Sequence, residues 1–167
     1  MNAADIGRRP AGEPDLPFLF ELYSATRAAE LAVTPWNAAQ KRAFLVMQFQ
    51  AQLAGYRSAF PQGTHEIVTL SGLPAGRLYL ARLPDCLRIL DITVAPDLRN
   101  GGIGSAVIRE ILAEAERLST PVTIYVESFN PSLSLFQRLG FRVASQESFQ
   151  LYLEHAPALP AGRPAAV

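Results

Sequence analysis

Apolar residues in the first third of the chain follow a helical spacing, with a period close to 3.6 residues. This spacing predicts a helix that begins with Asp15 as its N-cap and a longer helix over about residues 38–58, ending near Phe60. Asn37 and Gln40 stand three residues apart, which is the capping-box pattern at the start of the longer helix. We therefore expect two helices before the first strand.

The period changes to two at residue 64, which is typical of strands. Residues 64–70, 76–83 and 87–94 predict an antiparallel meander, with a turn at SGLPA between the first two strands. A helical period returns over residues 102–118. A strand, a short helix and two closing strands are then expected at 121–128, 131–139, 141–146 and 149–155. This order predicts an α+β fold with a mixed sheet, flanking helices and at least one crossover.

Composition narrows the range of partners. Fifteen basic and fifteen acidic residues cancel, which argues against binding to nucleic acid through its phosphates. One cysteine and two isolated histidines offer no set of metal ligands. The N-terminus lacks the apolar core of a secretory signal and no apolar run has the length of a membrane span, so we expect a cytoplasmic protein that binds no membrane. Residues 157–167 are rich in proline and alanine and are expected to be disordered, which leaves one domain over residues 1–156.

Three glycines are concentrated at residues 99–104, in the run RNGGIG between a predicted strand and a predicted helix. Their spacing does not match either common nucleotide loop, and no Lys-Ser or Lys-Thr pair follows. Glycines allow successive backbone N–H groups to point inward at the positive end of a helix, and Arg99 adds a permanent charge. The run favours an anion site that would fit a pyrophosphate, with a flexible connection between strand and helix as the alternative.

This run follows a strand that ends in TVAP, and a second segment, VESFNPSLSLFQRLGF at 126–141, follows it. Together the two segments resemble the acetyl-CoA signatures of the GNAT acetyltransferase superfamily. The resemblance implies a single-domain GNAT-like fold, with a mixed, mostly antiparallel sheet and a splay between its two central strands. It also implies acetyl-CoA as the acetyl donor, with no metal ion.

Carried over to this sequence, the resemblance implies which residues contact the cofactor. The pyrophosphate would be held by the backbone of Arg99, Asn100, Gly101, Gly102, Ile103 and Gly104. The edge of the strand at Ile92, Thr93 and Val94 would bind the pantetheine amides, and Asn130 would contact the pantetheine arm at the splay. Phe136, in the helix that lines the thiol end, stands where the family commonly has a tyrosine that protonates the departing sulfur.

Two carboxylates are candidates for the catalytic base. Asp91 lies in an apolar strand, directly before the expected cofactor-binding backbone, and could hold or deprotonate the amine. Its alternative is a structural salt bridge to Arg77, Arg82 or Arg88. Glu127, at the end of the strand TIYVES, is the second candidate, with a solvent-facing carboxylate as its alternative.

Acceptor-binding candidates lie in and before the long helix. Gln48, Gln52 and Tyr56 recur every four residues and share a face with Phe44, so they either line a substrate pocket or mark the boundary of a buried face. Trp36 has the same two readings, as a substrate contact or as a core residue.

The sequence thus predicts an N-acetyltransferase that transfers the acetyl group of acetyl-CoA to a primary amine of a small molecule or peptide by direct attack. The expected assembly is a monomer or a homodimer. The alternative is a non-catalytic module that binds coenzyme A or acetyl-CoA as a sensor, which the phenylalanine at position 136 favours.

Overall fold

The structure is a computed structural model, and it describes residues 2–158. The predicted disordered tail at 157–167 lies almost entirely outside the described residues. Over the described residues two compact units are present: one comprises residues 2–81 and 91–104, and the other comprises residues 82–90 and 105–158.

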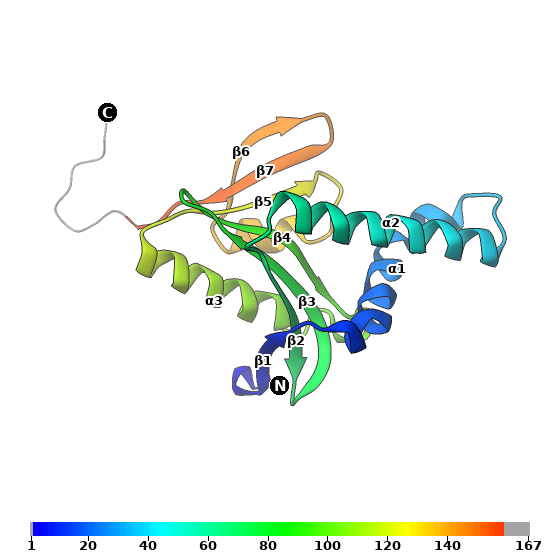
Figure 1. The fold of residues 1–167 in the computed structure, drawn as a ribbon. Coiled ribbons are helices and arrows are strands. Elements are labelled where there is room, and N and C mark those ends of the chain that lie inside the picture. Colours follow the sequence, from blue (N-terminus) through cyan, green and yellow to red (C-terminus); the bar gives the residue numbers. More distant parts are fainter. Residues whose placement is uncertain (1, 159–167) are drawn as a thin grey trace. The chain divides into compact units, whose positions relative to one another are not determined.

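Within residues 2–158, seven strands form one sheet in the order β1-β2-β3-β4-β5-β7-β6 (Figure 1). The strands are β1 Ile6–Pro10, β2 Thr64–Leu70, β3 Leu73–Arg82, β4 Leu87–Val94, β5 Val122–Glu127, β6 Arg142–Glu147 and β7 Gln150–His155. The helices are α1 Leu16–Ala32, α2 Ala38–Ala59, α3 Ile103–Leu118 and α4 Leu133–Arg138. The predicted α+β fold with a mixed, mostly antiparallel sheet is confirmed.

The start of α2 is formed by the predicted capping box. Asn37 Oδ1 accepts a hydrogen bond from the Gln40 backbone N–H, and the Gln40 side chain accepts one from the Asn37 N–H, both at 2.9 Å. Asp15 stands at the N-cap position of α1, but its side chain makes no capping bond. It accepts from Arg9 at 2.8 and 2.9 Å and from the Gly12 N–H instead, and these bonds lower its pKa to about 2.

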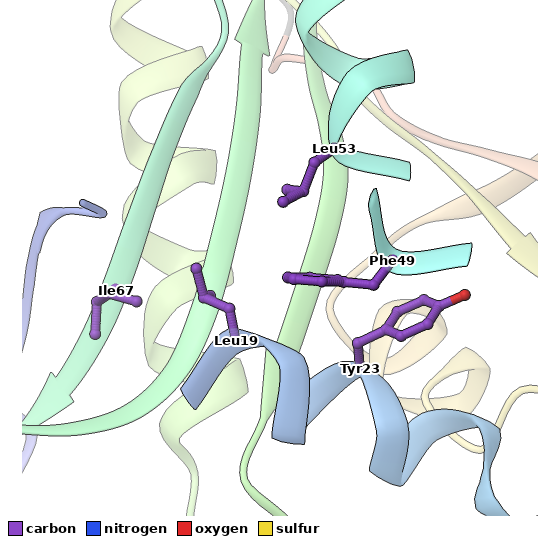
Figure 2. Packing of buried hydrophobic residues seen from close by; sticks show 5 residues of the cluster. All are labelled: Leu19, Tyr23, Phe49, Leu53 and Ile67. Carbon is purple, nitrogen blue, oxygen red and sulfur yellow. The ribbon is translucent and has the colours of Figure 1, made fainter. Parts of the chain in front are cut away.

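The core of the first unit joins its two helices to the sheet. Leu19 and Tyr23 from α1, Phe49 and Leu53 from α2, and Ile67 from β2 form one buried cluster (Figure 2). The rings of Tyr23 and Phe49 lie 5.5 Å apart, between their centroids. The apolar residues of each helix recur at helical spacing, so each helix turns one side toward β2.

The connection between β2 and β3 is shorter than the SGLPA turn predicted for it. Ser71 and Gly72 alone form the turn, and their φ values of 50° and 80° are the positive values at both positions that a type I′ hairpin turn needs. Pro74 is already in β3, next to a bulge opposite Val68 and Thr69. β1 was not predicted. It is a short edge strand with two arginines and a proline, which carry no alternating apolar signal.

In the second unit, β4 and β5 run parallel, and the pairing joins residues 87–89 to residues 122–124. Beyond these pairs β4 continues to Val94 and β5 to Glu127. β7 pairs antiparallel with both β5 and β6. Leu118, the last residue of α3, is 58% exposed, whereas Ile108 in the middle of the helix is buried.

Candidate functional site

The loop before α3 has the backbone conformation of an anion-binding turn. Asn100 and Gly102 both have positive φ, 63° and 85°, and the helix begins at the next residue, Ile103. A Cβ added to Gly102 would meet no atom within 4 Å, so the space beside this backbone is open. The first N–H groups of a helix have no acceptor within it, and this loop therefore offers them to a ligand.

Arg99 adds a cation to the same loop. Its side chain is exposed, and its Nε donates to the carbonyl of Val94 at 3.2 Å. The bond ties the arginine to the end of β4, the strand from which the loop departs. Positive charge, two left-handed backbone residues and open space together suit a small anionic group.

The end of β4 requires a glycine on the neighbouring strand. A Cβ at Gly76 in β3 would lie 2.5 Å from the carbonyl oxygen of Thr93, which no side chain could occupy. Ile92, Thr93 and Val94, the predicted pantetheine-binding edge, are all half-buried.

Asp91 forms the salt bridge that the sequence left as its alternative role, and the partner is Arg77 on β3. The Arg77 Nη1 donates to Asp91 Oδ2 at 2.9 Å, and the two side chains are 2% and 17% exposed. The other carboxylate oxygen, Oδ1, accepts from the hydroxyl of Thr93 at 2.7 Å. Both oxygens of Asp91 are therefore engaged.

Two further residues complete the surroundings of Arg77. Its Nη1 also donates to Gln52 Oε1 in α2, and its Nε donates to His65 Nε2 in β2, both at 2.9 Å. Burial, with Arg77 as the second cause, lowers the pKa of His65 to about 4. His65 is thus neutral at pH 7 and can accept this bond.

Two tyrosines complete the cluster around Arg77, which also contains Asp91, Gln52 and His65. The guanidinium carbon of Arg77 lies 6.0 Å from the ring centroid of Tyr56 and 5.8 Å from that of Tyr79. Burial and then the charge of Asp91 raise the pKa of Tyr56 to about 12. Arg77 Nη2 is buried and has no hydrogen-bond partner among the described residues, and the two aromatic faces lie within cation–π range of the guanidinium.

The acceptor-binding candidates divide between two places in the first unit. Gln52 and Tyr56 lie at the Arg77 cluster, while Gln48 is half-buried one turn earlier on the same helix. Trp36 packs on Phe44, with centroids 5.2 Å apart, and is 38% exposed. Both the substrate and the packing readings therefore stay open for Gln48 and Trp36.

The second signature segment lies in the second unit. Asn130 Oδ1 accepts from the backbone N–H and hydroxyl of Ser132, at 2.9 and 2.7 Å, and so shapes the turn before α4. Phe136 is 1% exposed, and its ring packs edge-on against Phe141. Glu127 is exposed at the end of β5, and no side-chain hydrogen bond or ion pair involves it within residues 2–158.

Sequence reasoning named Arg77 only as one of three possible partners of Asp91 and did not single out His65. The signal for Arg77 is an arginine at a buried position of the strand GRLYLAR, where a charge requires a partner. His65 gives no such signal, because a half-buried histidine in a strand is unremarkable.

Over the part of the chain that the structure describes, no group of three potential ligands could hold a metal ion. Within the same residues, no helix combines the length and the apolar character needed to cross a bilayer.

Known structures share this fold. The PaiA N-acetyltransferase of Thermoplasma acidophilum, solved with coenzyme A, is similar with a TM-score of 0.68 and 14% identity, over 90% of this chain and 98% of that chain. The ribosomal-protein-S18-alanine N-acetyltransferase of Escherichia coli has a TM-score of 0.64 and 16% identity, over 96% and 99%. The yncA structure of Salmonella typhimurium, solved with acetyl-CoA, has a TM-score of 0.56 and 20% identity, over 97% and 99%.

A search of curated proteins found no match. The model of the acetyltransferase (GNAT) family matches residues 15–141, which is most of the chain and includes both signature segments. The chain therefore belongs to the GNAT family of acetyltransferases, and the protein is an acyltransferase enzyme.

Proposed function

We propose that this enzyme transfers the acetyl group of acetyl-CoA to the primary amine of a small molecule or peptide by direct attack. The observation that carries the proposal is the loop at residues 99–104, with two positive φ values immediately before α3, in a chain of the GNAT family. Neighbours solved with coenzyme A or acetyl-CoA support the same ligand.

Bound acetyl-CoA would supply the acetyl group as an activated thioester. The loop backbone and Arg99 would hold its pyrophosphate, and the edge of β4 at residues 92–94 would bind its amide groups. Asn130 would meet the pantetheine arm with its Nδ2 group, because its Oδ1 is engaged by Ser132. Phe136 cannot donate a proton to the departing thiolate, so we assign it a packing role.

The incoming amine must lose a proton, and two carboxylates could assist. Glu127 is exposed and makes no ion pair within the described residues, so its oxygens are available to an amine. Asp91 is bonded to Arg77 and Thr93, which makes it a better anchor than base. We therefore propose Glu127 as the first candidate for the base and keep Asp91 as the second.

Turnover of acetyl-CoA against a panel of amine classes, followed by release of free thiol, tests the proposal. Small amines, amino acids and peptides with free N-termini belong in the panel. Thiol release that depends on one amine class, with the acetylated amine identified by mass, is the expected result. If acetyl-CoA binds but no amine is acetylated, the proposed function is wrong and the sensor alternative gains support.

Two glycines of the chain provide a matched test of the cofactor loop. Gly102 and Gly72 have nearly equal φ, 85° and 80°, and a Cβ at either would meet no atom within 4 Å. An alanine at either position therefore carries a similar backbone cost, on the order of 1 kcal/mol. Gly102→Ala is expected to weaken coenzyme A binding in calorimetry, because its Cβ enters the space beside the loop backbone. Gly72→Ala should bind normally, and equal affinities for the two variants would contradict the loop assignment.

A further inference from the structure

The hydroxyl of Thr93 has a fixed direction. It lies 2.7 Å from Asp91 Oδ1, and the other oxygen of that carboxylate accepts from the buried guanidinium of Arg77. A carboxylate paired with a buried cation is ionised, and an ionised carboxylate can only accept hydrogen bonds. The hydroxyl proton of Thr93 must therefore point toward Asp91.

A threonine hydroxyl ordinarily serves as donor or acceptor, whichever its partner requires. Because its proton is donated to Asp91, Thr93 Oγ1 can act only as a hydrogen-bond acceptor toward any other group. Thr93 as a residue is half-buried rather than buried in the core. It stands in the middle of the three-residue edge 92–94.

The hydrogen bonds of Arg77 prevent the hydrogen bond between Thr93 and Asp91 from reversing its direction. Gln52 and His65 each accept a hydrogen bond from Arg77, which leaves the guanidinium one orientation in which all three acceptors are met. His65 is neutral at pH 7, because its pKa lies near 4, so it does not repel Arg77. The polarity of Thr93 is thus set by residues of α2, β2 and β3.

We infer that Thr93 is a specificity-determining residue that accepts a hydrogen bond from an N–H of the incoming amine. This inference rests on the proposed function. A primary amine has two N–H groups and one lone pair, so holding one N–H at Thr93 Oγ1 would orient the lone pair for attack. A secondary amine has a single N–H, so it has one way of making this contact where a primary amine has two. Asp91 then acts as a positioning residue, through Thr93.

Four variants test this assignment at saturating acetyl-CoA. Thr93→Val keeps the shape but removes the acceptor, and it is expected to lower kcat/KM for the amine about tenfold or more. Thr93→Ser keeps the hydroxyl and is expected to restore most of that loss. In Asp91→Asn the new amide can donate to Thr93, which turns the hydroxyl proton outward and should also lower kcat/KM. Asp91→Asn added to Thr93→Val should cost little more, since the two act through one contact.

The pH profile separates positioning from base catalysis. If Asp91 only orients Thr93, the Asp91→Asn loss persists as the pH rises, whereas loss of a base is relieved when the amine deprotonates unaided. Calorimetry with coenzyme A separates the two possible N–H sources, the amine and the pantetheine amides. The inference predicts unchanged coenzyme A affinity in Thr93→Val.

Three outcomes would overturn the inference: an unchanged kcat/KM in Thr93→Val, a loss confined to coenzyme A affinity, or recovery of Asp91→Asn at high pH. A wild-type enzyme that acetylates no amine contradicts the proposed function instead. The two failures are thereby distinguished.

Discussion

Arg77 is the most deeply buried charge that we describe in the first unit, and its removal should be costly. Arg77→Met keeps much of the side-chain volume but leaves Asp91, Gln52 and His65 without their shared donor. Breaking a buried ion pair by removing one partner costs about 3–5 kcal/mol. Because the Asp91 side chain retains 17% exposure, water can partly replace the lost donor, and we expect the lower end of that range.

Arg8 provides the matched control. It also lies on a strand of the first unit and also pairs with a carboxylate on the next strand, Glu66, but at 3.4 Å and with 22% of its side chain exposed. Arg8→Met should therefore cost clearly less than Arg77→Met. Trp36, the single tryptophan of the chain, lies in the first unit, so its fluorescence during urea unfolding reports on both variants.

A double variant tests the coupling between Arg77 and Asp91 even if the cost of each single variant is small. Arg77→Met with Asp91→Leu removes both charges, so its cost should be clearly less than the sum of the two single costs. A strictly additive result would show that the pair contributes no coupling. An Arg77→Met cost equal to that of Arg8→Met would show that burial does not set the energy of this arginine.

Three further predictions concern single residues. His65 has a pKa near 4 when folded, below its ordinary value of 6.5, so the unfolded chain takes up a proton first. The free energy of unfolding should fall as the pH drops from 6.5 to 4, by about 1–2 kcal/mol after allowance for partial exposure, and His65→Gln should flatten this part of the curve. Arg99→Ala should weaken coenzyme A binding by about 1–3 kcal/mol in calorimetry, whereas Arg109→Ala, at an exposed position of α3, should not. Phe136→Tyr buries a hydroxyl at a position that is 1% exposed, so it should lower the free energy of unfolding by about 1–3 kcal/mol. It should raise turnover by no more than about 100-fold. A larger gain in the thiol-release assay would show that the wild-type enzyme is limited by the lack of a general acid at this position.

Most of the fold could be predicted because its elements have local causes. β2 and β4 match their predicted limits, since their alternation and the turns beside them are contained in a few consecutive residues. The capping box of α2 was predictable for the same reason. β1 was not, because an edge strand is held by pairing with β2 and has no buried face of its own that would leave a pattern.

The residues of the site also divide into those with a local sequence signal and those without one. The loop at 99–104 could be predicted because six consecutive residues carry its glycines, its arginine and its place before a helix. The cluster around Arg77 could not, because its members come from α2, β2, β3 and β4 and meet only through the pairing of the sheet. The sequence indicated that Asp91, a carboxylate in an apolar strand, needs a partner, but only the structure identifies Arg77 as that partner.

The unequal burial of that pair connects its stabilising and functional roles. Arg77 is 2% exposed and Asp91 is 17% exposed, so the cation lies on the inner side and the carboxylate on the outer side. A cation so enclosed cannot be reached by a substrate, and its influence must pass through the group it holds. Asp91 transmits it by fixing the proton of Thr93, whose oxygen lies on the strand edge proposed to bind the cofactor. The buried charge thus determines the polarity of the Thr93 hydroxyl, which a surface salt bridge, free to exchange partners with water, could not do.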